Sequence, residues 1–274
     1  MLKNKIIFLD LDGTLIDNSL YAPASALEAI RLAKINGHRL YINTGRSVCQ
    51  IYDYIWEQGF DGFIGGNGIY IESEGNPLFH QPIPQPLVEK VYNYLVEHEI
   101  GFFEEGQESL YAHPAYLPDL ASLLNVSIDE ARAKTDHIFP TTAYDCTQSH
   151  SEVNKISIVL TGKADIQAIC EFLKPELVLG LWELFGNDRE FADIYQGTTS
   201  KGTAVEFVMK HHNLPISDSY CFGDSSNDIE MIRVAGTGIA MGNAIPSLKA
   251  IADYVAAPVG QDGLYKAFKQ LSLI

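Results

Sequence analysis

Short apolar runs alternate with helical patterns through the N-terminal part of the chain. Residues 6–9, Ile-Ile-Phe-Leu, form the continuous apolar run that is typical of a fully buried strand in a parallel sheet. Residues 24–36 place apolar side chains at helical spacing, and Gly37 follows as a helix end. The alternation continues with a strand at 38–43, a helix at about 48–57 and a strand at 60–66. This is the spacing of βαβ units, and it predicts a doubly wound parallel sheet.

The C-terminal part of the chain repeats this alternation. A helical pattern comes first, and strands and helices then follow one another up to a closing helix. The expected elements are a helix at 202–211, a strand at 218–224, a helix at 226–235, strands at 236–241 and 252–257, and a helix at 263–271. We therefore expect the two ends of the chain to form one α/β core.

The middle of the chain has a different pattern. Three prolines within residues 80–86 indicate a linker, and the segments that follow are longer, more polar and richer in aromatic residues. Ser127 is expected to cap a helix there, with Glu130 completing a capping box. We interpret the middle as an α+β domain inserted into the sheet domain. The predicted division is a first core part at 1–83, the insert at 84–195 and a second core part at 196–274.

Composition and charge narrow the class of protein. The chain has 274 residues, of which 46% are hydrophobic and 20% charged, as in globular proteins. Its formal net charge is −16. Proteins that bind nucleic acid or an anionic membrane need a positively charged surface, so we expect neither as a partner. The N-terminus does not have the pattern of a signal peptide, no stretch approaches the ~20 apolar residues of a membrane helix, and we expect a cytoplasmic protein. The four cysteines form no CxxC metal or redox motif.

Polar side chains gather where predicted core strands end or a core helix begins. Each group alone is typical of an ordinary turn or helix cap. In an open α/β sheet, however, ligands bind outside the carboxyl ends of the strands, so all of the groups could converge at one edge. The groups are Asp10-Leu11-Asp12, Asn43-Thr44-Gly45-Arg46, Lys201-Gly202 and Gly223-Asp224-Ser225-Ser226-Asn227-Asp228.

These residue types together indicate phosphoryl transfer. Asp10 could be a nucleophile or a metal ligand, and the Thr44 hydroxyl and Gly45 N–H suit an anion because a helix is expected to begin there. Two carboxylates about 4 Å apart repel each other by roughly 1–4 kcal/mol, so several of them with only Lys201 and Arg46 nearby need a cation. Oxygen ligands without His or Cys favour Mg²⁺ over Zn²⁺. A Mg²⁺ site beside a phosphate cradle and a lysine fits phosphoryl transfer.

The same segments resemble the motifs of the haloacid dehalogenase superfamily of phosphohydrolases. DLDGTL resembles its first motif, NTGR its second, Lys201 its third and GDSSND its fourth. The insert is similar in length to the large type II cap of the Cof-like sugar-phosphatase branch, and GGNG at 65–68 resembles that branch's NGA segment with isoleucine in place of alanine. The resemblance implies a Rossmann-like core with an inserted cap.

The resemblance also implies roles for individual residues. Asp10 would attack phosphorus and form an aspartyl-phosphate. Asp12 would protonate the leaving alcohol and then activate water. The remaining implied roles are phosphate binding by Thr44, Gly45, Lys201 and Asn227, metal binding by Asp10, Asp224 and the Asp12 carbonyl, bracing by Asp228, and a substrate contact or an acid pairing for Arg46.

The predicted function is Mg²⁺-dependent hydrolysis of small phosphomonoesters, sugar phosphates above all. The expected partner is therefore a small phosphorylated metabolite. A phosphotransferase or mutase on the same fold, a phosphoacceptor signalling module and a non-catalytic sugar-phosphate sensor are alternatives. The insert is expected to set specificity, with candidate residues Glu104, Glu105, Tyr111, Lys155, Trp182 and Asn187.

Overall fold

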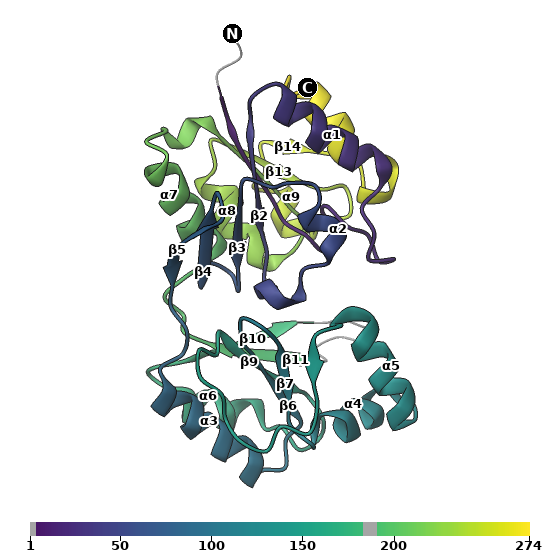
Figure 1. Ribbon diagram of the computed structural model, residues 1–274, viewed down its shortest axis with the longest axis vertical. Coiled ribbons are helices and arrows are strands. Elements are labelled where there is room, and N and C mark those ends of the chain that lie inside the picture. Colours follow the sequence, from purple (N-terminus) through teal and green to yellow (C-terminus); the bar gives the residue numbers. More distant parts are fainter. Residues whose placement is uncertain (1–3, 183–190) are drawn as a thin grey trace. The chain divides into compact units, whose positions relative to one another are not determined.

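Two compact units make up the chain in this computed structural model, and each unit has its own sheet (Figure 1). The structure describes residues 4–182 and 191–274. The first unit contains the chain up to Arg46, Ile51–His80 and Thr199–Ile274, and the second contains Ser47–Gln50 and Gln81–Thr198. The sequence-based division after residues 83 and 195 did not place the short segment Ser47–Gln50 with the second unit.

Eight strands form the sheet of the first unit. Their order departs from the chain order, because the first strand lies in the middle of the sheet, between strands from the two ends of the chain. Across the sheet they are β14 (Tyr254–Val255), β13 (Thr237–Ala240), β12 (Ser219–Gly223), β1 (Ile6–Leu9), β2 (Arg39–Asn43), β3 (Gly62–Gly65), β4 (Tyr70–Ser73) and β5 (Asn76–His80).

The strands from β14 to β3 pair in parallel, and β3, β4 and β5 pair antiparallel. The predicted doubly wound α/β core is confirmed, and the antiparallel strands extend it at one edge. Helices lie on both faces of this sheet (Figure 1). They are α1 (Ala24–Ile35), α2 (Asp53–Trp56), α7 (Lys201–His211), α8 (Ile229–Val234), α9 (Pro246–Lys249) and α10 (Gly263–Gln270).

Apolar packing holds the helices to the sheet on both faces. On one face, Phe8 of β1 belongs to a buried cluster with Val205 of α7 and Met231 of α8. On the other, Phe222 of β12 packs against Phe268 of α10, with ring centroids 5.1 Å apart. Burial on both faces explains why these strands have continuous apolar runs.

The predicted helix at 48–57 is wrong in its extent. The chain forms a 3₁₀ turn at Val48–Gln50, and α2 begins only at Asp53. Tyr52 between them has an extended backbone, with φ −70° and ψ 141°, so one continuous helix cannot pass through it. The predicted helix at 226–235 likewise begins as a 3₁₀ turn at Ser226–Asp228 and becomes α8 at Ile229.

The second unit is an α+β structure with a six-stranded sheet. Neighbouring strands pair antiparallel, except for one parallel pair at the edge. In order across the sheet they are β10 (Val178–Trp182), β11 (Phe191–Tyr195), β9 (Lys155–Val159), β6 (Phe102–Glu105), β7 (Leu110–Ala112) and β8 (Thr142–Ala143). The helices are α3 (Gln85–Glu97), α4 (Tyr116–Leu124), α5 (Ile128–Ile138) and α6 (Ile166–Leu173).

Side chains of α3 and α6 cover one face of this second sheet. Val91 and Ile169 belong to a buried cluster with Phe102, Ile156 and Ile194 of the strands. The predicted capping box at the start of α5 is confirmed, since the Ser127 and Glu130 side chains each bond the other's backbone N–H. In the part of the chain that the structure describes, no helix has both the length and the apolar character needed to cross a membrane.

Candidate active site

Three neighbouring parallel strands of the first unit end in the predicted polar groups. Asp10 directly follows β1, Thr44 follows β2 and Asp224 follows β12. In the sheet, β1 lies between β12 and β2, and the Asp10 N–H donates to the carbonyl of Phe222 at 3.0 Å. The carboxyl ends of parallel strands share one edge, so segments more than 200 residues apart in the sequence meet there.

Lys201 links two of the carboxylates. It is fully buried at the first position of α7, directly after Ser200, which caps that helix. Its Nζ donates to Oδ1 of Asp10 at 2.5 Å and to Oδ1 of Asp228 at 2.6 Å. Burial alone would lower the pKa of Lys201, but these two carboxylates raise it above its ordinary value. The lysine is therefore a permanent positive charge in the site.

Asp228 acts as a brace. Its Oδ1 accepts from Lys201, and its Oδ2 accepts from the backbone N–H groups of Asp224 (2.8 Å) and Ser225 (2.9 Å). Both oxygens of this fully buried carboxylate thus have protein partners. Asp228 therefore holds the Lys201 ammonium group and the start of the loop that carries Asp224.

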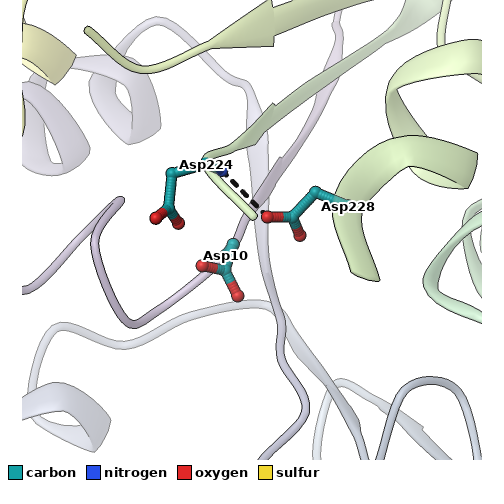
Figure 2. A group of neighbouring side chains, drawn as sticks. All are labelled: Asp10, Asp224 and Asp228. Atoms are coloured by element: carbon teal, nitrogen blue, oxygen red, sulfur yellow. Dashed lines mark hydrogen bonds between the residues drawn. The ribbon is translucent and has the colours of Figure 1, made fainter. Parts of the chain in front are cut away.

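The carboxylates of Asp10, Asp224 and Asp228 face one another (Figure 2). One oxygen from each can be chosen so that all lie within 4.8 Å of one another. Burial raises the pKa of Asp10 well above its ordinary value, more than Lys201 lowers it. Burial and then the charge of Asp228 raise the pKa of Asp224 to about 6. One lysine does not balance three carboxylates, so the group has an affinity for further positive charge.

A hard divalent cation fits this group of oxygens. Thr14 donates to Oδ1 of Asp224 at 3.1 Å, and Lys201 donates to Oδ1 of Asp10. Asp10 and Asp224 therefore each keep a second oxygen for a metal, whereas both oxygens of Asp228 are already bonded. The chain also passes very close to Asp224, because a Cβ on Gly13 would lie 2.4 Å from Oδ2 of that residue. Gly13 has φ +81°, a conformation that favours glycine. An all-oxygen set suits a hard ion such as Mg²⁺ better than Zn²⁺.

Asp12 lies apart from the three-carboxylate group and pairs with Arg46. Nε of Arg46 donates to Oδ2 of Asp12, and Nη2 donates to Oδ1, both at 2.7 Å. The Asp12 side chain is 50% exposed, whereas the Arg46 side chain is 8% exposed and lies over the ring of Tyr52. Of the two roles that the resemblance left open for Arg46, the structure displays the pairing with an acid.

The predicted phosphate-binding residues lie close to one another. Thr44 is buried and its Oγ1 accepts the N–H of Arg46 at 3.2 Å, so the loop turns tightly around Gly45. A Cβ on Gly45 would lie 3.4 Å from Nδ2 of Asn227, so the glycine keeps this approach open. The Thr44 hydroxyl, Gly45 and the Asn227 amide are thus near one another at the sheet edge where Asp10 also lies, and hydroxyl, amide and backbone N–H groups are the types that bind an anion.

Comparison with known proteins identifies the family. The family model for haloacid dehalogenase-like hydrolases matches residues 7–268. The chain belongs to this family. Bacillus subtilis YkrA is 30% identical over 275 residues, which cover 99% of each chain. Escherichia coli pyridoxal phosphate phosphatase YbhA is 27% identical over 256 residues, which cover 92% of each chain.

A solved structure shows the same fold. The subclass IIB sugar phosphatase BT4131, from the same superfamily, superposes with a TM-score of 0.74 at 26% identity, and covers 99% of this chain and 100% of its own. The predicted membership of the haloacid dehalogenase superfamily, in the branch of the Cof-like sugar phosphatases, is therefore confirmed. The alignment also spans the whole insert, which the sequence motifs did not reach.

Thr14 is a residue of this hydrolase site that sequence reasoning missed. It lies inside the quoted segment DLDGTL, but its hydrogen bond to Asp224 joins residues 210 positions apart. Only the parallel pairing of β1 with β12 brings the two together. A residue of the segment DLDGTL thus contacts a residue of the segment GDSSND, and no local sequence pattern could indicate this contact.

Several insert residues named from the sequence bond to each other within the second unit. Lys155 donates to Oδ2 of Asp193 (2.7 Å) and lies 3.1 Å from Oε1 of Glu105, and Trp182 Nε1 donates to Oδ1 of Asp193 (2.7 Å). Glu104 faces His150 instead, and Tyr111 stacks on that histidine. Asn187 lies outside the described residues.

Proposed function

We propose that this chain is a Mg²⁺-dependent phosphatase that hydrolyses small phosphomonoesters through an aspartyl-phosphate on Asp10. The observation that carries the proposal is the buried Asp10 carboxylate beside Lys201, with Asp12 two residues further on. A nucleophile, a fixed positive charge and a separate proton carrier are what stepwise phosphoryl transfer to and from a side chain requires.

In the first step, a carboxylate oxygen of Asp10 bonds to phosphorus while the bond from phosphorus to the alcohol oxygen breaks. Asp12 gives its proton to the leaving alcohol. In the second step, Asp12 takes a proton from water, whose oxygen bonds to phosphorus and releases Asp10 and inorganic phosphate. Thr44, Gly45 and Lys201 hold the phosphoryl oxygens through both steps.

The Asp10 and Asp224 carboxylates, with the backbone carbonyl of Asp12, would hold Mg²⁺. The bound ion would supply positive charge that offsets the charge of the phosphoryl oxygens. The raised pKa values of Asp10 and Asp224 support their place in this set, and Asp228 is left out because both of its oxygens accept protein hydrogen bonds. The Asp12 carbonyl is included because the family resemblance implies it.

Small phosphorylated metabolites, and sugar phosphates first among them, are the proposed substrates. BT4131 is a sugar phosphatase by name, and YbhA is a pyridoxal phosphate phosphatase. Both names denote a small phosphomonoester, and both proteins align with nearly the full chain. Because the chain has a net charge of −16, a site that binds an anionic phosphoryl group must place its few cationic side chains close to that group.

A substrate panel tests the proposal. Hexose phosphates, pyridoxal phosphate, FMN and nucleotides are incubated with the protein, with and without Mg²⁺, and released phosphate is measured. The wild type is expected to turn over substrate only when Mg²⁺ is present. The control variant Asp129→Asn, which changes an exposed aspartate on α5, should behave in the same way, whereas Asp10→Asn should show no turnover. Full activity of Asp10→Asn would refute the proposal. Excess acceptor alcohol in the same assay separates hydrolysis from phosphotransfer.

A further inference from the structure

Asn67 lies in the turn between β3 and β4, next to the loop Thr44-Gly45-Arg46. Two backbone hydrogen bonds attach this turn to the loop. The Asn67 N–H donates to the carbonyl of Thr44 at 3.0 Å, and the Gly66 N–H donates to the carbonyl of Arg46 at 2.9 Å. These bonds fix the turn to the loop on both sides of Gly45.

The Asn67 side chain ends beside Gly45, in the proposed phosphate site. A Cβ on Gly45 would lie 3.3 Å from Oδ1 of Asn67 and 3.5 Å from its Nδ2. Asn67 is half-buried, and Asn227 on the opposite side is exposed. Two asparagine side chains therefore border the glycine that the phosphoryl group must approach.

A short series of hydrogen bonds orients the Asn67 amide. Oγ of Ser225 donates to Oδ1 of Asn227 at 2.6 Å, and Nδ2 of Asn227 donates to Oδ1 of Asn67 at 3.1 Å. Because Oδ1 of Asn67 is the acceptor, its Nδ2 is the remaining donor. Within residues 4–182 and 191–274, no acceptor binds this Nδ2. A donor without an acceptor beside an anion loop is suited to a phosphoryl oxygen.

The backbone of this turn has a left-handed conformation and is closely packed. Asn67 has φ +58°, between Gly66 at +58° and Gly68 at +94°. Asparagine tolerates this left-handed conformation better than most residues. A Cβ on Gly68 would lie 2.6 Å from the carbonyl oxygen of Ser200, the residue before Lys201. The turn is thus held between the second and third polar groups of the site.

We propose that Asn67 is a substrate-binding residue that donates a hydrogen bond from Nδ2 to a non-bridging oxygen of the phosphoryl group. The inference rests on the proposed function and extends the phosphate site beyond the four groups of residues found in the sequence. Its ligand class is the phosphomonoester dianion, and inorganic phosphate is the simplest probe.

Asn67→Gly is the sharpest test, because glycine keeps the left-handed backbone and removes only the side chain. Asn67→Asp keeps the shape but replaces the donor with a negative charge. The matched control is Asn213→Gly, an exposed asparagine at φ +54° that follows α7. Binding of inorganic phosphate to each protein is measured by calorimetry with Mg²⁺ present, together with KM, kcat and the unfolding temperature.

The phosphate Kd of Asn67→Gly is expected to rise about 10- to 100-fold, the loss that follows removal of a hydrogen bond to a charged group. Asn67→Asp is expected to bind more weakly still, and Asn213→Gly as tightly as the wild type. An unchanged Kd in Asn67→Gly would overturn the inference, and so would a wild type that binds no phosphate. If the wild type binds phosphate but hydrolyses none of the panel, the proposed function fails while the Kd comparison still decides the role of Asn67.

Discussion

Arg46 binds the Asp12 carboxylate with two parallel hydrogen bonds, from Nε to Oδ2 and from Nη2 to Oδ1, both at 2.7 Å. A paired geometry of this kind holds the carboxylate plane in one orientation, which a lysine cannot do. Since Asp12 is half exposed and Arg46 is buried, the arginine is the fixed partner. We infer that Arg46 positions the proton carrier.

Replacing Arg46 should therefore slow the chemical step. Arg46→Lys keeps the charge but loses the two-point contact, and kcat is expected to fall about 10- to 100-fold, a part of the roughly 10²- to 10⁴-fold that general acid–base catalysis contributes. Tyr52→Phe keeps the ring beneath the guanidinium and removes the long hydrogen bond, 3.4 Å, from Nη1 of Arg46 to the tyrosine hydroxyl. It serves as the control and should change kcat little, because the two bonds to Asp12 remain. In Asp12→Asn, the further change Arg46→Lys should have almost no effect on kcat. Additive losses in the double variant would contradict the positioning role.

Lys201 should be essential for stability as well as for activity. Lys201→Met leaves Asp10 and Asp228 buried without their positive partner, and the free energy of unfolding is expected to fall by about 3–5 kcal/mol. Arg31→Met breaks the exposed pair with Glu28 and should leave the free energy of unfolding almost unchanged. Urea unfolding measures the free energy of unfolding of each variant. If Lys201→Met lost no more stability than Arg31→Met, the buried network would be unimportant for stability.

The metal-free protein should become less stable as the pH rises from about 4 to about 6. The pKa of Asp224 is about 6 in the folded protein and 3.8 ordinarily, so the unfolded chain loses this proton first. The folded state binds more protons in this range, and its stability falls until the pH passes about 6. Asp224→Asn should flatten this part of the profile, measured by unfolding in EDTA, whereas Asp129→Asn should not. A profile that Asp224→Asn leaves unchanged would contradict the assignment.

Mg²⁺ should reverse this loss above pH 6. Binding needs ionised carboxylates, so the ion should stabilise the protein more at pH 7.5 than at pH 5, since the raised pKa of Asp224 is about 6. The shift in unfolding temperature on adding Mg²⁺ measures this effect. The shift should vanish in Asp224→Asn. A shift that is equal at both pH values would show that the ion binds elsewhere.

The second unit contains its own buried ion network, and Lys155 is its only cation among the described contacts. Burial raises the pKa of Glu105, while Glu105 and Asp193 keep Lys155 charged against the effect of burial. Lys155→Met should destabilise this unit by about 3–5 kcal/mol. The control Lys163→Met breaks a pair of similar length with Asp119, but Lys163 is 45% exposed and its loss should cost far less. Hydrogen exchange of β9 and β11 measures the difference, and similar losses in both variants would contradict it.

The core of the first unit could be predicted because its strands are buried on both faces and have continuous apolar runs. Asp10, Thr44 and Asp224 were predictable for the same reason, since each follows such a run. The insert was harder to predict. β6 pairs antiparallel with β9, a strand far along the chain, and it ends in Glu104 and Glu105, which are buried beside His150 and Lys155. Two adjacent glutamates do not look like a buried strand until their partners are known.

The contacts of side chains across the site were beyond prediction for a related reason. The pairing of Arg46 with Asp12 and the hydrogen bond of Asn227 to Asn67 depend on how β1, β2, β3 and β12 are ordered in the sheet. The pattern of apolar residues indicates that such strands exist, but not which loop lies beside which. An acid pairing for Arg46 could be expected in general, but neither its partner Asp12 nor the partner of Asn227 could be named.

Direct detection of a phosphoryl group on Asp10 tests the central claim most directly. A substrate found in the panel is mixed with the protein and Mg²⁺, the reaction is stopped during turnover, and borohydride reduces any aspartyl-phosphate to homoserine. Peptide mass spectrometry should then find homoserine at position 10 and nowhere else, and none in Asp10→Asn. Sustained turnover with aspartate intact at position 10, or with homoserine at another position, would contradict the proposal.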